Sequence, residues 1–244
     1  MTIDDRLAPV LEAAASHAAD VDEHGRYPEE AVAALRSSGL LGLTLPVEVG
    51  GLGAGPEEFS RVTGRLAGAC GSTSMIYLMH VAAAMPLASA TPTGADLLKG
   101  MASGELLGTL AFSEKGSRSH FWAPVSQARA RSDGSRGVQL TADKSWVTSA
   151  GHADVYVVST KSVGGETPTT TDLYAVTAEH GGFEVSAPWL GMGLRGNASS
   201  PMRFDTGVEE GLRLGDSGSG FGTMMGVVLP WFSLGNASIT LGLA

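Results

Sequence analysis

The first hundred residues of the chain repeat apolar positions every three or four residues, with polar and small residues between them. This spacing predicts a series of amphipathic helices. Thr2 and Asp5 form the pattern of a capping box at the start of the first helix, and Pro28 stands at a first helical position. Beyond the opening helix, the pattern predicts helices from Pro28 to Gly39, from Pro56 through Leu66, from about Ser72 to Ala88 and from Thr93 to Met101.

From Glu105 onward the apolar spacing changes toward two, which predicts β-strands. Short strands are expected at residues 106–112, 125–130, 137–142, 154–160, 173–177 and 202–205. A glycine-rich stretch from Gly215 to Phe221 then leads into a final helix. The predicted fold class is α+β: an N-terminal helical domain (1–104), a central β-barrel-like domain (105–216) and the first helix of an incomplete C-terminal helical domain (217–244).

The composition narrows the class of protein. With 244 residues and 43% hydrophobic content, the chain can bury a sizeable core. A net charge of −9 argues against nucleic acid as a partner. The lone cysteine, Cys70, is expected to be a small buried residue, and the start of the chain does not resemble a signal peptide. We therefore expect a cytoplasmic protein.

No charged residue follows Asp216, so the end of the chain passes the length test for a membrane span. Pro230, Asn236 and several Ser and Gly residues argue against a span, as does the lack of a flanking cluster of Lys or Arg. We predict no membrane span and interpret this segment as a fully buried helix of a bundle.

Two familiar patterns carry little weight here. Residues 191–196 match the dinucleotide fingerprint Gly-x-Gly-x-x-Gly, but the residues after them lead into a strand, so no Rossmann site is expected. The six histidines show no metal-ligand spacing, and no metal is predicted. His80 is interpreted as a helix-face histidine whose ring nitrogen is hydrogen-bonded.

Two segments say more together than separately. Residues 111–119 (AFSEKGSRS) follow a strand and supply backbone donors, hydroxyls and two cations. Residues 144–150 (KSWVTSA) place an aromatic plane beside a hydroxyl at a strand end. A flavin needs donors for N5, N1 and its carbonyl oxygens, an apolar or aromatic wall, and positive charge for its pyrophosphate. Either segment alone is better explained as an ordinary polar turn or a core tryptophan.

Taken in order, these segments resemble the acyl-CoA dehydrogenase family over nearly the whole chain. The resemblance rests on the two segments above, on LRSSGLLGLTLPVEVGGLG at residues 35–53, on CGSTSMIYLMH at 70–80, and on the stretches 193–205 and 215–221. It implies a helical domain, a central β domain and a four-helix C-terminal domain. It also implies FAD as the cofactor and homo-oligomers, usually tetramers.

The resemblance further implies which residues contact the ligands. Those expected to contact FAD are Leu110, Phe112, Ser113, Ser119, Trp146, Val147 and Thr148, and Ser119 is also expected beside the acyl-CoA. In the family, a carboxylate removes the α-proton of the thioester while the β-hydride moves to flavin N5. The expected partners are an acyl-CoA or related small molecule and an electron-accepting flavoprotein.

The loop at residues 114–120 reads Glu-Lys-Gly-Ser-Arg-Ser-His, where the family usually has Glu-Pro-Gly-Ala-Gly-Ser-Asp. Lys115 and Arg118 either meet a phosphate or carboxylate of the substrate or are solvated loop charges. Glu114 is interpreted as structural, a carboxylate that accepts backbone N–H bonds. The chain shows no candidate catalytic base, so we expect the base beyond Ala244, in a chain that is partial or is completed by another chain.

The sequence thus predicts an FAD-dependent oxidoreductase of fatty acid metabolism that forms an α,β-double bond in an acyl-CoA thioester. Two alternatives stay open. The altered loop favours a flavin-dependent monooxygenase of the same architecture, and the missing base favours a non-catalytic partner subunit.

Overall fold

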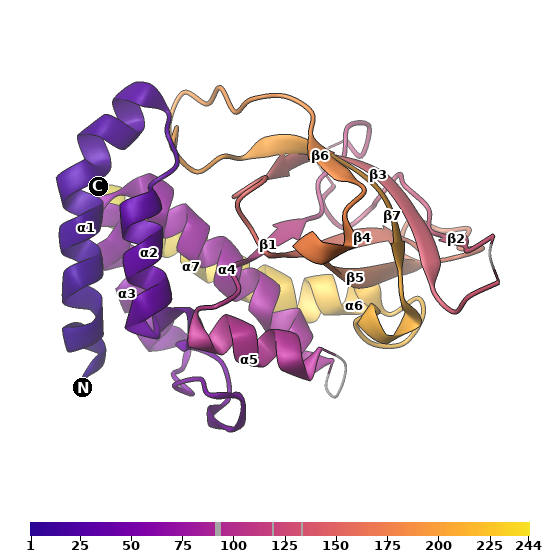
Figure 1. Cartoon of the computed structure of the whole chain (residues 1–244), viewed down its shortest axis with the longest axis horizontal. Helices are drawn as coiled ribbons and strands as arrows, with labels where there is room; N and C mark the ends of the chain where they lie inside the picture. The colour runs from indigo at the N-terminus through magenta and orange to yellow at the C-terminus, as the bar shows by residue number, and fades with distance from the viewer. Residues whose placement is uncertain (91–93, 119, 133) are drawn as a thin grey trace.

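A computed structural model describes residues 1–90, 94–118, 120–132 and 134–244. A helical part lies beside a part made of strands, and the last helix runs back along the helical part (Figure 1). The helices of the first part are α1 (Ile3–His24), α2 (Glu29–Ser38), α3 (Pro56–Ala69), α4 (Gly71–Ser89) and α5 (Ala95–Ser103), with single 3-10 turns η1 (Leu40–Gly42) and η2 (Val47–Val49).

These helices confirm the ones expected from the sequence. The Thr2 hydroxyl accepts a hydrogen bond from the Asp5 backbone N–H (3.1 Å), and the Asp5 carboxylate accepts one from the Thr2 N–H (2.8 Å), which completes the capping box. Helix α2 ends at Gly39, whose φ of 76° is the left-handed conformation that glycine adopts without strain. Thr93, expected to begin the fifth helix, lies outside the described residues.

Helix α4 lies at the centre of the molecule and is buried on almost every side. Tyr77 and Leu78 belong to the core of the helical part, whereas Ala83 and Leu87 pack in the same cluster as Val157 of the sheets. A helix that is apolar all round is stable only where neighbours cover every face. Helix α4 therefore joins the helical core to the strands.

The strands form two sheets. The first has the order β1 (Gly108–Ala111), β4 (Val155–Lys161), β5 (Thr171–Thr177), in which β1 is parallel to β4 and β4 is antiparallel to β5. The second is antiparallel, with the order β2 (Arg129–Ala130), β3 (Val138–Val147), β7 (Ser200–Val208), β6 (Phe183–Val185).

Strand β4 is buried on both faces because it lies between the helices and the second sheet. Val155 and Val157 pack into the cluster that contains α4, while Tyr156 and Val158 pack against the second sheet. Strand β3 instead alternates buried and exposed residues, because one of its faces is covered and the other is not. The α+β fold class is confirmed.

Several strands differ from the sequence prediction, and β7 (Ser200–Val208) is longer at both ends than the predicted 202–205. Within the strand expected at 125–130, the backbone N–H groups of Val125 and Ser126 donate to the Glu114 side chain. Residues 126–128 form only a single bridge to Lys161 at the end of β4, and the strand β2 is limited to Arg129–Ala130. Strand β3 continues to Val147 through an irregular register near its end. Strand β6 is not predicted, since three residues are too few to display an alternating pattern.

The last helix consists of α6 (Gly220–Thr223), the π-helical turn η5 (Met224–Val228) and α7 (Leu229–Leu243). By length and composition alone it could cross a membrane, and it is the one such helix found in the described part of the chain. It packs along α3 and α4, and Gly242 comes so close to Gly64 that an added Cβ would lie 2.1 Å from the Gly64 carbonyl oxygen.

The expectation that this helix is fully buried is wrong. Met224, Val228 and Ile239 are buried against the molecule, whereas the opposite face, which includes Ser233 and Ala237, is exposed. Its apolar composition matches a helix covered on all sides, but α3 and α4 cover one side only.

Candidate functional site

A buried ion pair fixes the loop that follows β1. The Lys144 ammonium donates to Glu114 Oε1 and to the Ser159 carbonyl oxygen, both at 2.6 Å. The Glu114 carboxylate also accepts hydrogen bonds from the backbone N–H groups of Val125 (2.6 Å) and Ser126 (2.8 Å). These bonds confirm the prediction that Glu114 has a structural role.

The pKa values of the pair follow from burial and from the opposite charge. Burial lowers the pKa of the Lys144 ammonium, and the Glu114 charge opposes that shift. Burial by itself raises the pKa of Glu114, but the Lys144 charge and the hydrogen bonds from Lys144 and Ser126 outweigh it and leave this pKa below its usual value. A carboxylate held by several donors in this way stays ionised.

The ion pair brings the two segments singled out from the sequence side by side. Glu114 and Lys144 form a β-bridge, and the Ser145 N–H donates to the Ser113 carbonyl oxygen at 2.8 Å. A second link joins β1 to the residue that follows β3: the Thr109 hydroxyl donates to the Thr148 carbonyl oxygen at 2.8 Å. The loop after β1 and the end of β3 therefore form one continuous surface.

A cavity of about 360 Å³ opens where this surface faces α4 and the last helix. It is lined by Met75, Met79, Leu110, Phe112, Ser113, Phe121, Trp146, Thr148, Ser199, Val228, Leu229 and Phe232. The walls are mainly apolar, and three hydroxyls interrupt them. This combination of size, apolar walls and few polar groups is typical of a site for a small molecule or cofactor.

Five of the seven residues predicted to contact a cofactor line this cavity: Leu110, Phe112, Ser113, Trp146 and Thr148. Val147 does not line it, because its side chain is fully buried in the core between the two sheets, as expected for the neighbour of Trp146 on an alternating strand. Ser119 lies outside the described residues.

Sequence reasoning missed the side of the cavity formed by helices. Met75 and Met79 lie one turn apart on α4, and Val228 and Phe232 lie one turn apart on the last helix. Both helices are apolar on nearly every face, so their residue pattern does not indicate which face turns toward the strands. Only the i, i+4 spacing of the two methionines could have suggested a shared lining.

The strand side of the cavity keeps an aromatic plane accessible. The Trp146 side chain is 61% exposed and meets Trp189 edge to face at 5.8 Å between ring centroids. The Thr148 hydroxyl is hydrogen-bonded to the Ser199 hydroxyl at 3.0 Å. Trp189 lies in the loop between β6 and β7 that also contains residues 191–196, and this glycine pattern leads into strand β7, as the sequence predicted.

His80 joins the helices to the sheets just behind the cavity wall formed by Met79. Its Nε2 lies 3.0 Å from the Leu41 carbonyl oxygen, and its Nδ1 accepts a hydrogen bond from the Gly108 N–H at 3.0 Å. Nδ1 as acceptor requires a neutral ring with the proton on Nε2. Complete burial lowers the pKa of His80 to about 4, and the expectation of a hydrogen-bonded structural histidine is confirmed.

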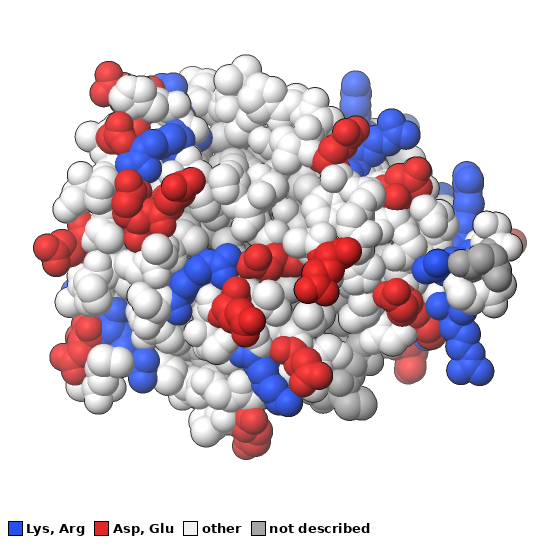
Figure 2. Space-filling model, in the orientation of Figure 1, with Lys and Arg blue, Asp and Glu red and all other residues white. Residues whose placement is uncertain are grey.

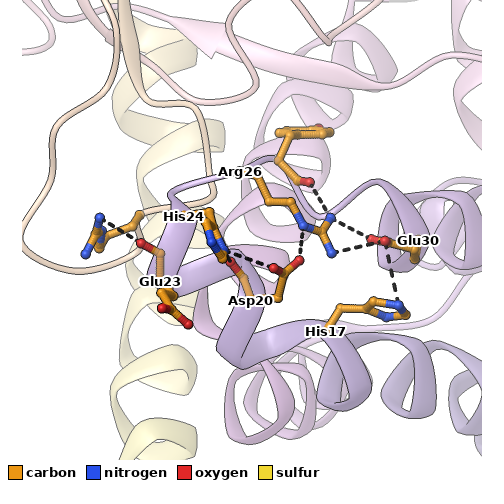
Figure 3. Close-up of polar contacts among 8 residues, drawn as sticks. His17, Asp20, Glu23, His24, Arg26 and Glu30 are labelled. Atoms are coloured by element: carbon orange, nitrogen blue, oxygen red, sulfur yellow. Dashed lines mark hydrogen bonds and ion pairs between the residues drawn. The ribbon is translucent and has the colours of Figure 1, made fainter.

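A cluster of ionisable side chains links α1 to α2 at the turn between these helices (Figure 3). Arg26 binds Glu30 through two hydrogen bonds of 2.9 and 3.0 Å and also binds Asp20; these bonds hold the pKa of both carboxyls below their usual values. His17 and His24 approach the same two carboxylates. None of these side chains lines the cavity, and over the described ranges no three His, Cys, Asp or Glu residues are grouped to hold a metal.

The surface charge is mixed rather than segregated. On the face shown in Figure 2, acidic and basic side chains are interspersed, and Lys and Arg side chains protrude at the end formed by the strands. The net charge of the chain is −9. This face therefore offers no broad basic surface of the kind that binds nucleic acid.

The fold and cavity define a class: a two-part α+β protein with a cofactor-sized cavity between strands and helices. Residues 6–105 match the acyl-CoA dehydrogenase N-terminal domain, and residues 109–206 match the acyl-CoA dehydrogenase middle domain. Together the two matches cover most of the chain. The chain belongs to the acyl-CoA dehydrogenase family, whose members are flavin-dependent oxidoreductases.

Individual relatives agree with this assignment. The chain is 29% identical over 214 residues to a protein of Mycobacterium leprae named probable acyl-CoA dehydrogenase, with 86% of this chain and 54% of the relative covered. It is 28% identical to L-evernosamine nitrososynthase of a Micromonospora species, with coverages of 84% and 49%. The structure of butyryl-CoA dehydrogenase from Megasphaera elsdenii has the same fold, with a TM-score of 0.89 at 21% identity over 99% of this chain and 66% of that one. The chain spans about half the length of the curated relatives named here.

Proposed function

We propose that the cavity between the loop after β1 and the end of β3 holds the isoalloxazine ring of FAD, in an oxidoreductase of acyl-CoA dehydrogenase type. The observation that carries the proposal is the meeting of two segments far apart in sequence, which bring Phe112 and Ser113 beside Trp146 and Thr148 around one apolar cavity. The Lys144–Glu114 pair keeps that surface in place without a ligand.

The residues present fit a flavin. Leu110 and Phe112 supply an apolar wall, and Trp146 offers an exposed ring against which a planar group can stack. The hydroxyls of Ser113 and Thr148 supply donors for polar edges of a ring otherwise held in apolar surroundings. Bound here, the flavin would accept a hydride from the β-carbon of an acyl thioester.

The same cavity limits what the described residues can do alone. Its lining contains no Asp or Glu, so no described residue there can take the α-proton of a thioester. We propose that the base comes from outside the described residues. The chain's own part of the reaction is then to bind and orient the flavin and to exclude water.

A titration with FAD tests the proposal. The visible absorbance of FAD should shift on binding, and Trp146→Ala should weaken the affinity about tenfold, because the stacking plane is lost. Thr148→Val should weaken it about three- to tenfold through the lost hydroxyl. Thr141→Val is the matched control, since Thr141 lies on the exposed face of the same strand and should leave the affinity unchanged. A chain that takes up no FAD, or that loses affinity equally in the control, would refute the assignment.

A flavin-dependent monooxygenase is the second candidate. The absence of a carboxylate from the described cavity lining favours it, because oxygen chemistry on a reduced flavin needs no thioester base. The likeness to a nitrososynthase also supports it. Oxygen uptake with externally supplied reduced flavin, in the absence of flavin bleaching by acyl-CoAs, would favour this candidate over the dehydrogenase.

The proposal extends to the domain limits, the cellular compartment and the oligomeric state. We propose the domain limits 1–104, 105–216 and 217–244, supported by the family matches over 6–105 and 109–206. We further propose a cytoplasmic homo-oligomer. The free, buried Cys70 supports the compartment, and the uncharged exposed face of the last helix supports the association.

A further inference from the structure

The described residues of the loop from Glu114 to Ala123, here called the rim loop, are linked by successive tight turns; Ser119 lies outside the described residues. The Ser117 N–H donates to the Glu114 carbonyl (3.2 Å), the His120 N–H to the Ser117 carbonyl (3.0 Å) and the Ala123 N–H to the His120 carbonyl (3.0 Å). The buried Lys144–Glu114 pair anchors the start of the loop. These turns therefore fix the backbone at the charged residues that lie between them.

Two cations of the rim loop have no ionic partner among the residues that the structure describes. Lys115 and Arg118 are both exposed, and neither takes part in an ion pair or hydrogen bond within the described ranges. Glu114, the carboxylate of the loop, is already bound to Lys144. Arg118 also keeps a φ of 53°, a conformation that costs a non-glycine residue about 1 kcal/mol or more. The loop thus presents two unneutralised positive charges on a chain of net charge −9.

Both cations lie close in sequence to residues that line the cavity. Ser113 and Phe121 line it, and Lys115 follows the first by two residues while Arg118 precedes the second by three. At about 3.8 Å between successive Cα atoms, the Lys115 Cα lies within about 8 Å of that of Ser113. The same spacing keeps the Arg118 Cα within about 12 Å of that of Phe121.

Contacts between aromatic rings join the end of the rim loop to the last helix. His120 packs on Trp122 with ring centroids 5.1 Å apart, and Trp122 meets Phe221 edge to face at 5.6 Å. These ring contacts hold the end of the rim loop against the last helix.

We propose that Lys115 and Arg118 form a recognition site for a phosphate group of the ligand bound in the cavity. Arginine suits this role because its planar guanidinium binds two oxygens of one phosphate, and lysine adds a second charge. The phosphate can belong to the flavin cofactor or to the carrier of an acyl thioester. This inference rests on the proposed function, since it requires that the cavity binds a flavin or a thioester.

Two ligand series separate these sources. The affinities of riboflavin, FMN and FAD, and those of pantetheine, dephospho-CoA and CoA, are measured for the unaltered chain, for Lys115→Ala/Arg118→Ala and for Arg129→Ala/Arg136→Ala. The last variant is the matched control, because it removes two exposed cations of the same strand-rich part. For the unaltered chain, gaining a phosphate should raise affinity about five- to tenfold in one series, the size of one or two partly exposed charge-assisted hydrogen bonds.

The proposal expects this gain to vanish in Lys115→Ala/Arg118→Ala and to persist in the control. It also expects the gain to shrink as salt rises from 0.05 to about 0.5 M in the unaltered chain, because the site is partly exposed. The series that shows the gain identifies the source of the phosphate. A phosphate gain that survives in the double variant, or no gain in either series, overturns the proposal.

Riboflavin and pantetheine keep this test distinct from that of the proposed function. Riboflavin carries no phosphate, so its binding reports on the cavity alone. If riboflavin binds equally to all three proteins but phosphates bring no gain, the recognition site fails while the flavin cavity stands. If no member of either series binds, both fail together.

Discussion

The ammonium group of Lys144 is the partner of a buried carboxylate, so its removal should have a large and measurable cost. The side chains of Lys144 and Glu114 are 0% and 3% exposed, and their charged atoms lie 2.6 Å apart. In Lys144→Met the aliphatic stem is kept and the charge is lost. The Glu114 carboxylate then stays buried with donors from the backbone N–H groups of Val125 and Ser126 and from the Ser126 hydroxyl, and the Ser159 carbonyl loses the Lys144 donor.

Breaking a buried ion pair from one side costs about 3–5 kcal/mol, because an uncompensated charge remains inside the protein. Small domains have a total unfolding free energy of about 5–15 kcal/mol, so a loss of this size is a large part of the whole. The loss should be read from urea unfolding at 25 °C, followed by tryptophan fluorescence. A fall in the midpoint at constant slope identifies a change in stability.

The pH dependence of the unfolding free energy provides a second test of Lys144→Met. In the unaltered chain, the lowered pKa of Glu114 contributes stability above its unfolded pKa, and this contribution is lost as pH falls through the folded value. Without Lys144, burial dominates and raises the pKa of Glu114, so folding becomes easier once the carboxyl is protonated. The difference in unfolding free energy between the two proteins should therefore narrow as pH falls from 8 toward 5.

Two further variants test whether the loss of the buried ion pair causes the loss of stability in Lys144→Met. Glu114→Gln/Lys144→Met removes both charges and should lose clearly less than the sum of the single variants. Lys99→Met is the control, since its exposed pair with Asp96 should contribute no more than about 0.5 kcal/mol. A loss below about 1 kcal/mol in Lys144→Met, or strict additivity in the double variant, would refute the reasoning.

Two other predictions follow from single residues. Because the folded pKa of His80 is about 4, below its unfolded value near 6.5, the unfolded state binds more protons between these values, and stability should fall by about 3 kcal/mol as pH drops from 6.5 to 4. This slope, measured by urea unfolding at several pH values, should be much smaller in His80→Gln and unchanged in His24→Gln, whose ring is exposed; an equal slope in all three proteins would contradict the assignment. Gly104→Ala places a Cβ 2.0 Å from the Arg36 carbonyl oxygen at a φ of 86°, and should cost about 2–4 kcal/mol in thermal unfolding. Gly134→Ala, at a φ of 74° with open space around it, should cost only about 1 kcal/mol, and equal losses would show that the close contact has no weight.

Local signals in the sequence were enough to predict the helices, most of the strands and the roles of several side chains. The capping box of Thr2 and Asp5 and the glycine stop at Gly39 depend on neighbours within a few residues, and the structure has both. Glu114 could be interpreted as structural because it stands in a turn that needs an acceptor for N–H groups. The pairing of its loop with the segment at Lys144 came from a family resemblance and not from the periodicity of either segment.

Tertiary structure alone decided which side chains surround the cavity. Met75, Trp146 and Phe232 are far apart in the sequence, and each lies there because a whole helix or strand is packed in one orientation. The sequence determined that α4 and the last helix are apolar, but a helix apolar on all faces does not encode the face that meets the strands. The sequence also did not show that Val147 points into the core while Trp146 and Thr148 line the cavity. The direction of a strand side chain depends on which face of the sheet is covered. Elements follow from local hydrogen bonds and spacing, whereas the cavity follows from the packing of elements against one another.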